Sequence, residues 1–77
     1  MEEYKNIPYE VHVDELGFDL GFTGYAVVYR IHGDGTIRVQ HLFFGEGHIF
    51  TSRQEASLLL GTIAEQYIEL EVKEEQG

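Results

Sequence analysis

The chain has 77 residues and a mass of 8.8 kDa, enough for one small domain, and its 14 acidic and 5 basic side chains give a formal charge of −9. It has no cysteine, so disulfides and thiolate metal sites are excluded, and the shortage of Lys and Arg argues against direct binding of nucleic acid. A hydrophobic content of 43% argues against disorder. No apolar run approaches the ~20 residues of a membrane helix, and the N-terminus does not resemble a signal peptide. We therefore expect a soluble, cytoplasmic protein.

The first predicted strand follows Pro8. Apolar residues at Tyr9, Val11 and Val13 alternate with polar ones, as in a half-buried strand. The stretch 15–24 contains three glycines and several apolar side chains, which fits either a loop that folds back on the core or an interrupted extension of the strand. Residues 1–7 are expected to be frayed.

The strongest signal is a hairpin formed by residues 25–31 and 37–43. Both runs alternate and are rich in β-branched and aromatic residues. A three-residue loop, Gly33-Asp34-Gly35, with Gly35 in the left-handed conformation keeps the two apolar rows on one face. This register predicts the pairs Ile31–Ile37, Tyr29–Val39, Val27–His41 and Tyr25–Phe43, all facing the core.

After the hairpin we expect a turn at Gly45-Glu46-Gly47 and a short strand over residues 48–50. Ser52 and Glu55 have the spacing of a capping box, which predicts that a helix begins there. Its apolar stripe consists of Ala56, Leu59, Leu60, Ile63, Ala64 and Tyr67. Residues 68–72 fit either a continued helix or a short strand, and residues 73–77 are expected to fray.

These elements predict a single α+β domain over residues 1–77, in which one amphipathic helix packs on one face of a three- or four-stranded antiparallel sheet. One helix covers only one face, so the other face is expected to be partly apolar and to contact a partner or a second copy. The residues predicted for this contact face are Ala26, Val28, Arg30, Arg38, Gln40, Leu42 and Phe44.

Arg30 and Arg38 are predicted to lie directly opposite each other. Like charges in that position destabilise a hairpin unless an anion lies close to them. Glu10 or Asp14 of the first strand is the favoured source of that anion, and a bound phosphate, carboxylate or acidic partner is the alternative.

Histidines offer weak candidates for a site. His12 and Asp14 share a strand face and could supply two metal ligands, but no third ligand is apparent, so no metal or other cofactor is predicted. His41 is predicted to be a neutral histidine at the edge of the core. No nucleophile with a base and no phosphate-binding loop is recognisable, so catalysis is not expected.

The acidic residues of the C-terminal region could form a functional surface. Residues Glu65, Glu69, Glu71 and Glu74 either provide solubility or imitate nucleic-acid phosphates. The leading hypothesis is a small, non-enzymatic protein-interaction module that forms homodimers. The alternatives are an inhibitor or antitoxin-like protein whose acidic surface blocks a basic groove, and a small binder of anions or metals.

Overall fold

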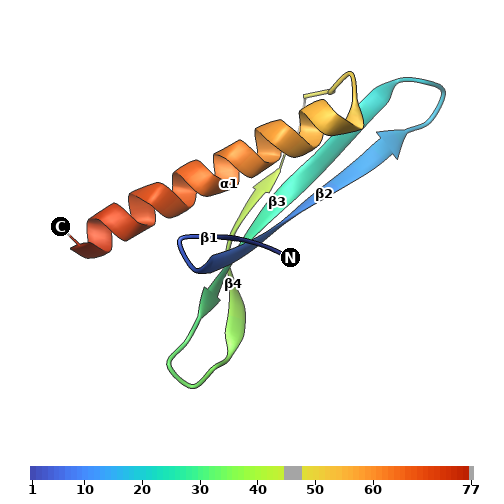
Figure 1. Ribbon diagram of the computed structural model, residues 1–77. Helices are drawn as coiled ribbons and strands as arrows, with labels where there is room; N and C mark the ends of the chain where they lie inside the picture. Colours follow the sequence, from blue (N-terminus) through green and yellow to red (C-terminus); the bar gives the residue numbers. More distant parts are fainter. Residues whose placement is uncertain (45–47, 77) are drawn as a thin grey trace.

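The computed structural model describes residues 1–44 and 48–76 and shows an antiparallel sheet with one helix along it (Figure 1). The predicted α+β fold is therefore confirmed. The hydrogen-bonded order of the strands is the order of the chain. The elements are β1 (Glu2–Tyr4), β2 (Ile7–Leu16), β3 (Gly21–Ile31), β4 (Ile37–Phe44) and α1 (Arg53–Gln76).

The first two hairpins extend the sheet beyond the predicted strands. Lys5 and Asn6 have φ values of 51° and 66° and form the tight turn that joins β1 to β2, so the stretch expected to fray contains a paired strand. Leu16 pairs with Gly21, which confirms the alternative in which the strands continue into the glycine-rich stretch. Phe18 and Asp19, at the tip of that hairpin, also have positive φ.

The loop between β3 and β4 has the predicted form. The amide of His32 donates to the carbonyl oxygen of Thr36 at 2.8 Å, and the amide of Gly35 donates to the carbonyl oxygen of His32 at 2.9 Å. Gly35 has a φ of 88°, a conformation that glycine adopts without a steric penalty. The carboxylate of Asp34 accepts the amide of Thr36 at 2.9 Å, which also stabilises the turn.

The predicted register holds near the loop and fails beyond it. Ile31 pairs with Ile37 and Tyr29 with Val39, as expected, but Val28 then pairs with His41, so Gln40 is an extra residue in β4. Such a β-bulge shifts every later pair by one residue. The predicted pairs of His41 with Val27 and of Phe43 with Tyr25 are therefore wrong. Val27 pairs with Leu42, and Tyr25 pairs with Phe44.

The face of β3 that meets the helix is the opposite of the predicted one. Ala26 and Val28, which were expected on the uncovered face, are 0% and 1% exposed and belong to the core. They pack with residues spaced four apart along one side of the helix, namely Ala56, Leu60, Ala64 and Ile68. Small residues let the helix approach the strands closely. The resulting close packing favours this face of the sheet over the other one, although the aromatic side chains on the other face are larger.

Helix α1 begins as predicted and is longer than predicted. Ser52 Oγ accepts the amide of Glu55 at 3.0 Å, so Ser52 caps the helix. The Glu55 carboxylate accepts the amide and the hydroxyl of Thr51 instead of the amide of Ser52, so the reciprocal half of the capping box is not formed. The helix continues to Gln76, so residues 68–72 are helical and the predicted frayed tail is helical up to that residue.

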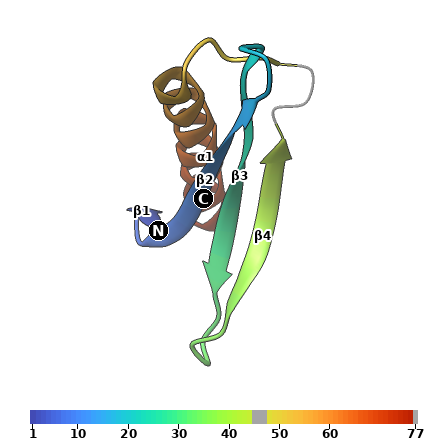
Figure 2. The same ribbon diagram turned by 90° about the vertical axis from the view of Figure 1, so that its right-hand side faces the viewer.

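Two further predictions concern the connection to the helix. The turn predicted at 45–47 lies outside the described residues. The short strand predicted at 48–50 is reduced to one bridge, in which Phe50 exchanges both backbone hydrogen bonds with Phe22, at 2.8 and 2.9 Å. The helix that follows packs along β2 and β3, whereas β4 lies at the margin of the sheet away from it (Figure 2).

Candidate functional site

The face of the sheet turned away from α1 is rich in apolar side chains. Alternation along β3 and β4 places them opposite the core residues, and the bulge at Gln40 keeps the side chains before and after it on the same face. We call this group of residues the open face. Its members are Tyr25, Val27, Tyr29 and Ile31 of β3 and Ile37, Val39, Leu42 and Phe44 of β4.

Much of the open face is accessible to solvent. Phe44 is 64% exposed, Val39 56% and Leu42 42%, and Ile31 and Ile37 are also about half exposed. Val27 is 5% exposed yet is not part of the core cluster beneath the helix, so its neighbours on the open face cover it. Exposed apolar groups that are contiguous in this way are typical of contact surfaces.

Aromatic rings run across the open face from β2 to β4. The ring of His12 stacks on Tyr25, with centroids 4.7 Å apart, and Tyr25 lies 6.1 Å from Phe44. His12 Nε2 lies 2.8 Å from a carboxylate oxygen of Glu10. Strand β2 therefore borders the open face with polar groups, among them Glu10 and Asp14, while β3 and β4 contribute its apolar part.

The structure keeps only part of the predicted contact face together. Leu42 and Phe44 lie on the open face, Ala26 and Val28 are buried in the core, and Gln40 is the bulge residue. The prediction missed six members of the face: Tyr25, Val27, Tyr29, Ile31, Ile37 and Val39. Their alternation was visible in the sequence, but it was assigned to the helix side.

Arg30 and Arg38 are directly opposite each other, as predicted. By alternation, however, they project on the helix side of the sheet, whereas Glu10 and Asp14 project on the open face, so the expected approach of these β2 acids is wrong. Arg30 lines a shallow hollow of about 260 Å³ together with Glu71 of the helix. A carboxylate of the chain itself thus lies in the same hollow as this arginine.

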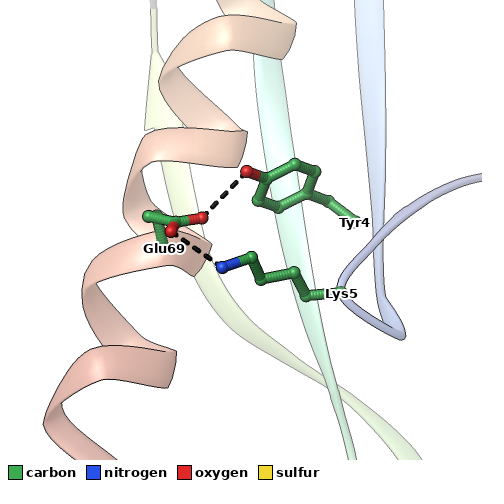
Figure 3. Close-up of polar contacts among 3 residues, drawn as sticks. All are labelled: Tyr4, Lys5 and Glu69. Carbon is green, nitrogen blue, oxygen red and sulfur yellow. Dashed lines mark hydrogen bonds and ion pairs between the residues drawn. The ribbon is translucent and has the colours of Figure 1, made fainter.

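Two glutamates of the predicted acidic surface fasten the helix to the first hairpin. Glu65 accepts the hydroxyl of Tyr9 at 2.7 Å. Glu69 accepts the hydroxyl of Tyr4 at 2.8 Å and binds the ammonium group of Lys5 at 2.7 Å (Figure 3). Burial and the bond to Glu65 raise the pKa of Tyr9 to about 12, so this phenol stays a donor at any physiological pH.

The contacts of Glu69 predict a loss of stability in acid. Lys5 and then Tyr4 hold the pKa of Glu69 below its ordinary value of 4.5. A carboxylate with a lowered pKa stabilises the fold above its unfolded-state pKa, and that contribution disappears as the pH falls through the folded-state pKa. We expect Glu69→Gln to unfold at lower urea concentration than wild type at pH 7, with the difference shrinking towards pH 3.

Glu74→Gln is the matched control, because it removes the same charge further along α1. The urea midpoint of this variant should differ little from that of wild type at both pH values. A Glu69→Gln variant that loses the same stability at pH 7 and at pH 3 would contradict a contribution from the ionised carboxylate.

A second apolar surface adjoins the open face. A groove of about 480 Å³ separates β4 from the flank of α1. Its walls include Phe43 from the strand, Phe50 from the connection, and Leu59 and Ile63 from the helix. Leu59 is 41% exposed and Ile63 38%, so the sheet does not fully cover this flank of the helix.

In the described parts of the chain, the histidines do not assemble into a site with other ligands. His41 lies on the helix side of β4 as predicted and stacks on Tyr67 with ring centroids 4.9 Å apart, but it is exposed and not buried. His12 and Asp14 share a face, yet His12 contacts Glu10. Over residues 1–44 and 48–76, no three His, Asp or Glu side chains come together as metal ligands.

Comparisons of this chain with protein-family models, with curated proteins and with solved structures find no match. Within the part of the chain that the structure describes, no helix has the length and apolar character needed to cross a membrane. Inference about function therefore rests on the surfaces described above.

Proposed function

We propose that this protein is a small, non-enzymatic interaction module that associates with a second copy of itself through the open face. The observation that supports this most directly is the row of half-exposed apolar side chains on β3 and β4. Packing two open faces together would make a sandwich of two sheets with the helices outside, an arrangement in which sheets lie ~10 Å apart.

The size of the open face fits a modest self-association. Strand β4 has eight residues, so at ~3.3 Å per residue the face is about 26 Å long, and the two strands β3 and β4, ~4.8 Å apart, make it about 10 Å wide. Its flat footprint is on the order of 250 Å², and the accessible area is larger because side chains stand up from the sheet. Standard interfaces bury ~800 Å² per partner, so we expect a dissociation constant in the micromolar range.

The distribution of charge also favours a second copy as the occupant. Two chains with a charge of −9 repel each other unless they meet where acidic side chains are absent. The members of the open face on β3 and β4 include no acidic residue. The acids of β2, Glu10 and Asp14, lie at its border, where water can still solvate them.

Sedimentation velocity over about 1–100 µM protein tests this proposal, because that range brackets the expected micromolar dissociation constant. We expect wild type to shift from 8.8 kDa to at least twice that mass as the concentration rises. Leu42→Glu places a charge in the contact, where it would lose its hydration, and should associate more weakly than wild type.

Leu58→Glu is the matched control. It introduces the same charge at a leucine of α1 that is 71% exposed, and it should associate like wild type. Circular dichroism would establish that both variants are folded. A wild-type chain that stays at 8.8 kDa at every concentration would contradict self-association, and a Leu42→Glu variant that associates as strongly as wild type would contradict the role of the open face.

A further inference from the structure

We infer that the outer edge of β4 is a second, separate contact, at which β4 of another copy pairs with it antiparallel and makes one continuous eight-stranded sheet. The four-stranded sheet of one copy ends at β4, and no strand among the described residues pairs with its outer edge. This contact uses backbone groups, whereas the open face uses side chains, so the two contacts can be tested independently.

Alternation of the hydrogen bonds identifies the residues with outward-pointing backbone groups. In an antiparallel pair, residues that exchange bonds with the neighbouring strand alternate with residues whose N–H and C=O point away from it. Phe22 exchanges both backbone hydrogen bonds with Phe50, and the amide of His32, just after β3, donates to Thr36. The even-numbered residues of β3 therefore form their backbone hydrogen bonds on the side of β4. The β4 residues that lie opposite odd-numbered residues of β3 have N–H and C=O groups that point away from β3, and these residues are Ile37, Val39, Leu42 and Phe44.

Charge distinguishes this edge from the other one. Beyond the short β1, the outer edge of β2 carries Glu10, Asp14 and Glu15, which would repel a second copy. Strand β4 has no acidic residue, and its only Lys or Arg is Arg38. It also contains no proline or lysine, the residues that commonly keep exposed edges from pairing. The edge open to another acidic chain is therefore that of β4.

The bulge makes β4 complementary to itself over its whole length. Full antiparallel overlap of two copies places Ile37 of one opposite Phe44 of the other, and Val39 opposite Leu42. In a regular strand these partners would lie on opposite faces, which a twofold axis through the sheet forbids. Because Gln40 shifts the alternation by one residue, all four share the open face and the outward edge.

Cross-linking of single-cysteine variants tests this register, and the chain has no cysteine of its own. Val39→Cys and Leu42→Cys are mixed under oxidising conditions at high concentration. Directly opposite residues have Cα atoms ~5.5 Å apart, which a disulfide can bridge, whereas stacked sheets lie ~10 Å apart, beyond its reach. We expect the mixed disulfide to form in the mixture and neither variant alone to form a dimer of this kind.

Amide hydrogen exchange supplies the second measurement. If the edges pair, the amides of Ile37, Val39, Leu42 and Phe44 become protected at high concentration and exchange fast at low concentration. Fast exchange at all concentrations together with no mixed disulfide would overturn the edge contact. If the mass still doubled and Leu42→Glu abolished that doubling, the open face would retain its role while the edge contact failed.

Discussion

Replacing Leu60 by alanine is expected to lower the free energy of unfolding by about 2–5 kcal/mol, the range found when a buried leucine leaves a cavity. Leu60 is 2% exposed and lies in the middle of the row of helix residues that contacts β3. A domain of 77 residues has only about 4–12 kcal/mol of total stability, so this loss is a large fraction of it. Urea denaturation followed by circular dichroism measures the loss.

Leu58→Ala is the control for Leu60→Ala, since it makes the same substitution on the same helix at a residue that is 71% exposed. We expect it to change the free energy of unfolding by no more than about 0.5 kcal/mol. All variants must be compared at one protein concentration, because self-association would add to the apparent stability. Equal losses for Leu58 and Leu60 would contradict the observed orientation of the helix.

Local signals in the sequence identify the elements but not the face on which they pack. The Ser52 cap predicts the start of the helix, and Gly35 predicts the three-residue loop between β3 and β4. Both depend on residues that are near each other in the chain. The alternation in β3 allows two orientations, and the larger aromatic row looks like the better core. The helix selects the other row because Ala26 and Gly24 leave it room to approach the sheet.

Part of the open face could be predicted from the sequence. A single helix cannot cover both faces of a sheet, so an uncovered face was expected from the element order alone. Which β4 side chains occupy it depends on the bulge at Gln40, which has no distinctive residue type to reveal it. Because the bulge lies in β4, it places Val39 and Leu42 on one face although they are three residues apart.

Gly24→Ala is expected to destabilise the protein by about 3 kcal/mol or more, although alanine is usually no worse than glycine in a strand. A Cβ atom at this position would lie 2.2 Å from the carbonyl oxygen of His12 and 3.0 Å from Cδ1 of Leu60. The oxygen belongs to the backbone of the paired strand β2, so it cannot move aside without breaking the ladder. Either the strands separate or the helix lifts away from the core.

Gly61→Ala in α1 should stabilise the protein instead of destabilising it. A Cβ there would meet only Cγ2 of Val11, at an ordinary contact distance of 4.0 Å, so the substitution should stabilise the helix by about 0.5–1 kcal/mol. Urea midpoints of the two variants at equal concentration test both signs at once. If Gly24→Ala were neutral, β2 and β3 would have to be further apart than described, and the close approach of the helix would no longer explain which face of β3 is buried.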